Sequence, residues 1–115
     1  MPQLTECCAL TWLQFSADHP ALPGHFPGRP VIPGVVLLAQ MQALLATHLA
    51  TPFQLQSLPT VKFLQPVLPN QALQLGIELT HHNEQQMRGR FMWRSADSNA
   101  LLAQGNFQLQ LAAAS

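Results

Sequence analysis

The sequence predicts an α+β fold in which a curved antiparallel sheet wraps around one helix. Three observations predict it. Segment 34–50 is apolar on nearly every side of a helix, later segments alternate apolar and polar residues with the period of a strand, and five of the ten prolines fall between Pro20 and Pro33. A sheet with one apolar face can cover a helix that has no polar face. At 115 residues, the chain fits one domain spanning residues 1–115.

The first half of the chain predicts a strand, a loop and the helix. "CALTWLQFSA" is rich in strand-forming residues and predicts the first strand. Proline removes backbone donors, so the segment from Pro20 to Pro33 predicts a loop, and its apolar residues favour an ordered one. Strong helix formers fill Gly34–Ala50, with Pro33 just before the first residue and Pro52 just past the end. We expect a long, wholly buried helix here.

The second half predicts a meander of about four antiparallel strands, for five or six in total. The candidate strands are "LPTVKFLQPVL", which Pro66 interrupts, "ALQLGIELTHH", "MRGRFMWRS" and "ALLAQGNFQLQL". The last three alternate residue by residue, as half-buried strands do. In "MRGRFMWRS", the arginines fall on one face and the aromatic residues on the other.

Composition limits the classes of function. Only 9% of residues are charged while 48% are apolar, so we expect buried subunit contacts and a homo-oligomer. The formal net charge of zero argues against a nucleic-acid binder. No apolar run approaches the roughly 18 residues of a membrane span. Cys7 and Cys8 are adjacent and predict small buried strand residues rather than a disulfide or a metal site. We expect a cytoplasmic protein without a cofactor.

Two segments carry a family resemblance. "HFPGRPVIPGVVLL" resembles the signature of the FabZ-type (3R)-hydroxyacyl-ACP dehydratases, which have the hotdog fold, and "VKFLQPVLPNQALQLGIEL" resembles the strand–turn–strand that follows. The resemblance covers residues 18–79 in motif detail and the rest by strand pattern. It implies a hotdog fold with the sheet around one long central helix, and activity on β-hydroxyacyl thioesters in fatty acid, polyketide or polyene-type biosynthesis.

The resemblance also implies the site. His25 would be the general base, and family members carry a Glu or Asp six residues after the proline that opens the helix. That position is Ala39 here, so the sequence keeps the base and lacks the acid. In the family, the histidine of one subunit faces the helix of the other, the acyl chain lies in a tunnel between them, and hexamers of three dimers are common.

Further candidates follow from the motif and from charge. The candidate substrate-binding residues are Phe26, Pro27, Gly28, Pro33, Val35, Gln40 and Gln42. A packed or interface role is the more usual one for glutamines such as these two. Acyl carrier proteins are acidic, so the candidate docking residues are Arg29, Arg88, Arg90 and Arg94. A solvated strand face explains the last three equally well.

The chemistry explains why these residue types would be needed. Dehydration removes a proton from C2 of the 3-hydroxyacyl thioester and expels hydroxide from C3. A neutral imidazole such as His25 can take the proton, and free N–H groups at the helix start, beginning with Gly34, can stabilise the enolate-like oxygen. The alternatives are a catalytically impaired hotdog protein that binds acyl chains or serves as a partner subunit, and an acyl thioesterase.

Overall fold

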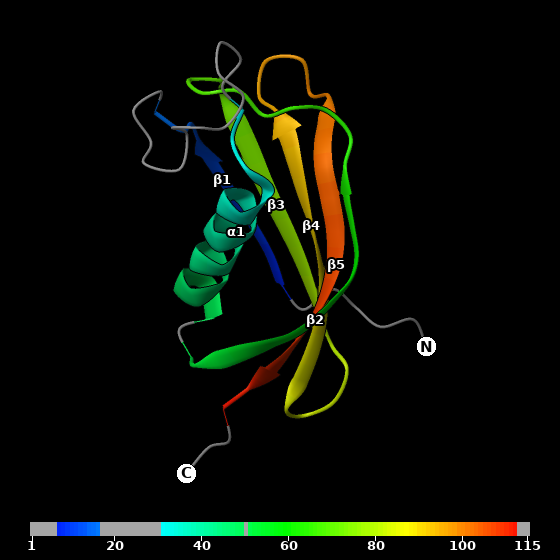
Figure 1. Ribbon diagram of the computed structural model, residues 1–115. Coiled ribbons are helices and arrows are strands. Elements are labelled where there is room, and N and C mark those ends of the chain that lie inside the picture. Colours follow the sequence, from blue (N-terminus) through cyan, green and yellow to red (C-terminus); the bar gives the residue numbers. More distant parts are fainter. Residues whose placement is uncertain (1–6, 17–30, 50, 113–115) are drawn as a thin grey trace.

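The computed structural model describes residues 7–16, 31–49 and 51–112, which form one helix and five strands. In chain order they are β1 (Cys7–Leu13), α1 (Gly34–Leu49), β2 (Phe53–Phe63), β3 (Leu73–His81), β4 (Gln86–Ser95) and β5 (Leu101–Leu111). The strands form one antiparallel sheet in the order β1-β3-β4-β5-β2, and α1 lies across one face of it (Figure 1). The predicted α+β class is confirmed.

The predicted four-strand meander is confirmed for β3, β4 and β5 and wrong for β2. Strand β2 pairs with β5 at the edge of the sheet opposite β1, so it is not a neighbour of β3. The connection from β2 to β3 contains Pro66 and Pro69 and is too long for the tight turn of a hairpin. It is held instead by other parts of the chain: the Asn70 N–H donates to the Phe15 carbonyl at 2.7 Å.

Strand β2 also differs from the prediction in its bounds. It begins at Phe53, five residues before the predicted start, and ends at Phe63, so Pro66 lies beyond it. The register with β5 shifts between Leu55 and Ser57 and again between Ser57 and Thr60. These irregularities accommodate Pro59, because an edge strand tolerates a residue that cannot donate to a ladder.

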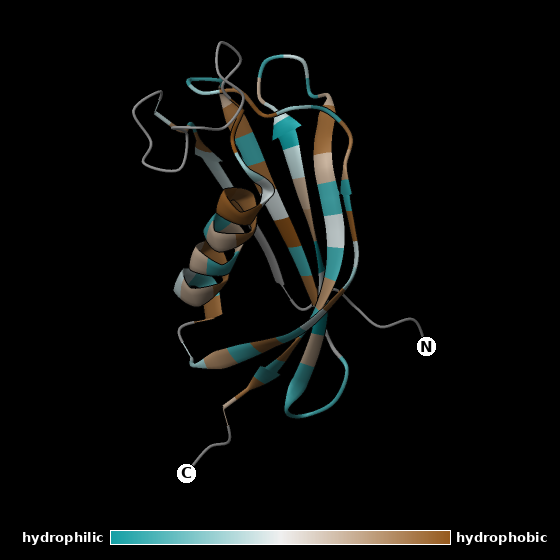
Figure 2. Ribbon diagram, viewed as in Figure 1, coloured by the Kyte–Doolittle hydropathy of each residue, from teal (hydrophilic) through white to brown (hydrophobic). Residues whose placement is uncertain are grey.

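One side of α1 and the inner face of the sheet make the core. Leu37, Met41 and Leu45 follow one another at four-residue spacing on the helix and are at most 2% exposed. The sheet contributes alternate residues of β3, β4 and β5, which appear as alternating bands in Figure 2. These core residues are Leu73, Leu75, Ile77, Leu79, Met87, Phe91, Trp93, Ala103, Phe107 and Leu109. The predicted strand faces are confirmed except at the start of β5, where a register shift against β4 buries Leu102 and leaves Leu101, expected on the apolar face, only partly buried.

The prediction that α1 is buried on every side is not met within one chain. Val35, Ala39, Ala43 and Ala46 are exposed on the side turned away from the sheet. The 16 residues of α1 make about four turns, so it is not the long helix we expected. No helix in the described part of the chain is both long and apolar enough to cross a membrane.

Two sheet glycines make a matched test of packing on the two faces. A Cβ on Gly105 would lie 2.7 Å from ring atoms of Phe91 and 2.7 Å from the Thr60 carbonyl oxygen, whereas one on Gly76 would meet nothing closer than 3.8 Å. We predict that Gly105→Ala lowers the free energy of unfolding by about 1–3 kcal/mol through overpacking. Gly76→Ala should leave it unchanged or raise it slightly. Urea denaturation measures the free energy of unfolding of both variants. An equal decrease in the two would contradict the close packing at Gly105 and the open space at Gly76.

Candidate active site at the start of the helix

An open apolar cleft of about 590 Å³ lies between the start of α1 and the end of β2. Residues 31–35 with Leu37 form one wall, and residues 63–67 form the other. Gln65 is the only one of these residues with a polar side chain, and none of them is charged. Such a cleft suits an apolar chain or a thioester rather than a charged ligand.

Backbone hydrogen bonds hold the walls of the cleft in place. The Ile32 N–H donates to the Val67 carbonyl at 2.7 Å, which ties one wall directly to the other. The Leu64 and Gln65 N–H groups both donate to the Leu102 carbonyl, at 2.8 and 3.1 Å. Leu102 belongs to β5, so the second wall is anchored to the sheet.

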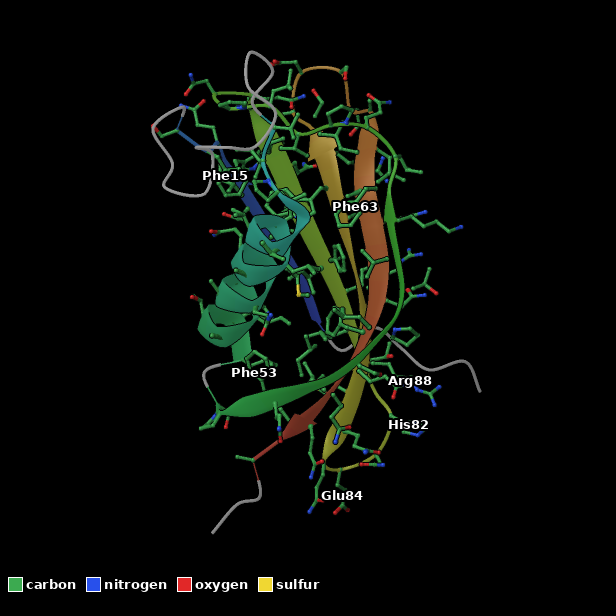
Figure 3. The ribbon with its side chains drawn as sticks, in the orientation of Figure 1. Phe15, Phe53, Phe63, His82, Glu84 and Arg88 are labelled. Carbon is green, nitrogen blue, oxygen red and sulfur yellow. The ribbon has the colours of Figure 1, made fainter. Side chains whose placement is uncertain are left out.

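The Phe63 ring lies directly over the first turn of α1. A Cβ on Gly34 would be 2.7 Å from Cζ of Phe63, so the ring occupies space that any other residue at position 34 would need. Phe63 is nevertheless 55% exposed, and it sits near the upper end of the sheet in Figure 3. With Leu64 and Val35, which are 51% and 72% exposed, it gives the cleft an apolar rim.

The helix start contributes hydrogen-bond donors to this apolar surrounding. The Pro33 carbonyl accepts from the N–H groups of Val36 and Leu37 at 3.0 and 3.4 Å. Within the described residues, the N–H groups of Gly34 and Val35 have no acceptor, and the first turn carries no acidic residue. Free amides at the positive end of a helix favour an oxygen that gains negative charge. Gly34 and Val35 both line the cleft.

The structure brings together only part of the predicted site. Pro33, Gly34 and Val35 line the cleft, as expected of a substrate-binding helix start. The loop residues His25, Phe26, Pro27, Gly28 and Arg29 lie outside the described residues. Their roles stay predictions.

The helix candidates lie away from this cleft. Ala39 is exposed on the side of α1 that faces away from the sheet, while Gln40 and Gln42 are half-buried on its two flanks. None of the three lines the cleft of a single chain. A group brought to Ala39 must therefore come from outside the chain's own sheet.

Sequence reasoning missed the second wall. The sequence predicts a strand over Phe63, Leu64 and Val67, and a strand prediction alone does not place these residues in a site. A usable signal was present: a strand that ends in Phe63-Leu64 just before a proline exposes large apolar side chains without a partner strand. The family resemblance also began at residue 61 for this segment.

The predicted docking arginines of β4 lie on the outer face of the sheet, away from α1. Arg90 Nε is 2.8 Å from Glu78 Oε2, and this hydrogen bond and charge pairing raise the pKa of Arg90 above its ordinary value. An Arg88 guanidinium nitrogen lies 3.4 Å from Nε2 of His82. Over the described parts of the chain, no three His, Cys, Asp or Glu side chains gather as a metal ion would require.

Comparison with known proteins places this geometry in a family. The model of the ApeI-like family, described as ApeI dehydratase, matches residues 3–106. A 3-hydroxyacyl-[acyl-carrier-protein] dehydratase FabZ from Anaeromyxobacter is 37% identical over 61% of this chain and 51% of that protein. This chain spans about half the length of the curated relatives it matches.

Solved structures share the fold over nearly the whole chain. The dehydratase heterocomplex ApeI:P from Xenorhabdus doucetiae is 23% identical, covers 96% of this chain and 99% of that one, and has a TM-score of 0.71. A 1,4-dihydroxy-2-naphthoyl-CoA thioesterase from Synechocystis is 13% identical, covers 95% and 85%, and has a TM-score of 0.74. The hotdog fold is thereby confirmed, and the match over residues 3–106 shows that this chain belongs to the ApeI-like dehydratase family.

Proposed function

We propose that this chain acts on β-hydroxyacyl thioesters of an acyl carrier protein, as a dehydratase of fatty acid, polyketide or polyene-type biosynthesis. The observation that carries the proposal is the apolar cleft at the helix start. Its free Gly34 and Val35 amides come a few residues after the His-Phe-Pro-Gly motif. Membership of a dehydratase family and relatives named for 3-hydroxyacyl-carrier chemistry support it.

The helix-start amides and His25 account for only part of the proposed reaction. In the proposed mechanism the thioester carbonyl accepts from the amides at the helix start, which stabilise the enolate-like oxygen as His25 takes the C2 proton. The C3 hydroxyl then leaves as water only if something protonates it. None of the described residues that line the cleft carries an acidic side chain, and the position that the family resemblance assigns to the acid is Ala39.

A partner-subunit role is the second candidate, and Ala39 favours it. A methyl group cannot donate a proton, and it lies on the exposed side of α1, where a second subunit can reach it. A neighbour in fold is described as a dehydratase heterocomplex. In this alternative the chain binds the acyl group or completes the site of a catalytic partner. A thioesterase, the third possibility, has only a shared fold to support it.

Restoring the acid tests the proposal. We predict that Ala39→Glu raises the dehydration rate of a 3-hydroxyacyl-carrier thioester by up to about 10²–10⁴-fold, the usual contribution of one acid–base group. His25→Ala should abolish the activity of both the wild type and Ala39→Glu. Ala39→Gln is the matched control, because it has nearly the same shape and cannot protonate the leaving group. The measurement is formation of the enoyl thioester at its ultraviolet absorbance.

The outcomes separate the candidates. Rescue by Ala39→Glu but not by Ala39→Gln means a dehydratase scaffold that lacks its acid. Fast turnover in the wild type with no gain on substitution means that another residue or a water supplies the proton. If no variant turns over the substrate yet all bind the acyl-carrier, the partner-subunit role is correct. Release of free thiol without an enoyl product would identify a thioesterase.

The contact between Gly34 and Phe63 gives a second test. We predict that Gly34→Ala pushes the Phe63 ring into the cleft and raises the KM for the thioester, or its Kd if the chain only binds. Stability should change little, because the ring is more than half exposed and can rotate away. Gly34→Ala/Phe63→Ala should recover part of the binding, since it removes the obstructing ring. Loss of folding in Gly34→Ala would show that the ring cannot move.

A site shared between two subunits is part of the proposal. The exposed apolar side of α1 and the low charge content support at least a dimer, with a hexamer of three dimers as the larger form. We predict that light scattering detects no stable monomer at micromolar concentration.

Mixed subunits test the sharing directly. A sample refolded or co-expressed from wild type and His25→Ala/Ala39→Glu should turn over faster than either parent. Only a mixed dimer joins an intact His25 to the introduced carboxylate of the other subunit. A mixture no faster than its parents would place the whole site within one chain.

A further inference from the structure

The outer face of the sheet concentrates the positive charge of the described chain. Pairing across the strands puts Lys62 of β2 and three arginines of β4 on this face, and these are all of the lysines and arginines in the described residues. Glu78 is the only acidic residue on the described part of this face, and it is paired with Arg90. Glu84 and Asp97 lie in the turns at the two ends of β4. A chain of zero formal net charge thus presents one strongly cationic face.

The surface between these charges is hollowed, and polar side chains make up part of its lining. Two neighbouring hollows of about 390 and 250 Å³ share Arg90 and Asn106. Thr80, Gln108 and Gln104 add further hydrogen-bonding groups to their walls. Arg88 and Arg90 line the larger hollow, and Lys62 lines the smaller one together with Arg90. Carboxylate side chains of a partner would find Arg88 at the larger hollow and Lys62 at the smaller one, with Arg90 between them already paired with Glu78 of the larger hollow.

An apolar patch borders the charges on the side of the edge strand β1. Leu10 and Trp12 are 58% and 62% exposed. The ends of Leu10 and Met92 both come within 3.8 Å of the place where a Cβ on Gly76 would stand, so they converge over that glycine. Tryptophan, methionine and arginine are among the residue types enriched in protein interfaces. The apolar patch can therefore anchor a partner protein, and the neighbouring cations can pair with its acidic side chains.

We propose that the outer face of the sheet is the docking surface for an acidic helical protein segment. Resting on the proposed function, this segment belongs to the carrier that presents the thioester. Arg88 and Arg90 are about 6.8 Å apart along β4, so two acidic side chains one helical turn apart, with a rise of about 5.4 Å, can reach both of them. Arg94 lies about 13.6 Å beyond Arg90 along the strand. Arg88 to Arg94 spans about 20 Å, the length of a helix of about 14 residues.

The positive charge of the outer face makes a second copy of this chain an unfavourable partner for it. A two-fold contact would set the same patch against itself, placing the arginines of one copy against those of the other. Like charges brought face to face are strongly unfavourable. An acidic partner has no such conflict, and it would leave the exposed side of α1 free for subunit contacts.

Two double variants test the surface. Arg88→Gln/Arg94→Gln removes two charges from the face, and Thr51→Glu/Gln85→Glu, at exposed turn positions, is the control with the same change in net charge. We expect the first pair to raise the Kd for a purified 3-hydroxyacyl-acyl carrier protein on the order of ten-fold, with a smaller effect at high salt. The control pair should change the Kd far less. Equal weakening by both pairs would overturn the proposal.

The apolar part is tested by truncation. Trp12→Ala should raise the same Kd with little dependence on salt, and Leu68→Ala, which truncates an exposed leucine outside the sheet, should not. Equal effects of the two truncations would overturn the anchoring role of Trp12. A 20-nucleotide single-stranded RNA is the competitor: if it displaces the carrier protein and its binding shows the same arginine dependence, the surface serves nucleic acid and the proposal fails.

A carrier-free substrate separates docking from the proposed chemistry. The 3-hydroxyacyl thioester of N-acetylcysteamine reaches the cleft without a carrier, so its binding or turnover should be the same in Arg88→Gln/Arg94→Gln and wild type. If Arg88→Gln/Arg94→Gln loses binding or turnover of the carrier-linked substrate but not of the carrier-free one, docking on the outer face is supported. An arginine-dependent Kd for the carrier without turnover of either substrate leaves the docking surface standing and overturns the dehydratase. Unchanged carrier binding overturns the docking surface and leaves the cleft chemistry intact.

Discussion

The packing of a single side of α1 against the inner face of the sheet is the constraint on which the rest of the structure depends. Leu37, Met41 and Leu45 are all but inaccessible to solvent, and truncating any one of them would cost about 2–5 kcal/mol. This packing fixes the rotation of the helix about its axis. It therefore places the Gly34 and Val35 amides beside Phe63 and turns Ala39 away from the sheet.

The same constraint divides the molecule into surfaces of different character. Alternation along β4 sends Phe91 and Trp93 to the core and the arginines to the outer face. Figure 3 shows Arg88 on the side of the sheet away from α1 and Glu84 in the turn below it. The cationic sheet face is thereby kept apart from the apolar cleft and from the exposed side of α1, which adjoin each other at Val35, so the proposed carrier protein need not compete with the proposed thioester or second subunit for one surface.

The sequence predicted what local pattern and period determine, and it missed what long-range pairing determines. Helix start, strand faces and the bounds of β3 to β5 follow from period and turn residues. The place of β2 beside β5 does not, because no local signal tells an edge strand which partner it will join. The cleft shows the same division: Pro33 to Val35 were expected, whereas the Phe63 wall depends on where β2 ends. His25 and its loop lie outside the described residues, so their part of the prediction is untested.

The orientation of Ala39 explains why the fold does not depend on whether position 39 holds a carboxylate or an alanine. Position 39 contributes nothing to the core, so a change from Glu or Asp to Ala removes a functional group without opening a cavity. Alanine is also the best helix former, which favours the substitution locally. Position 34 in the cleft is different, because a side chain on Gly34 would displace the Phe63 ring and so change the shape of the cleft. Under the partner-subunit alternative proposed above, a chain that binds a thioester without transferring a proton needs the cleft at the start of α1 and needs no carboxylate at position 39.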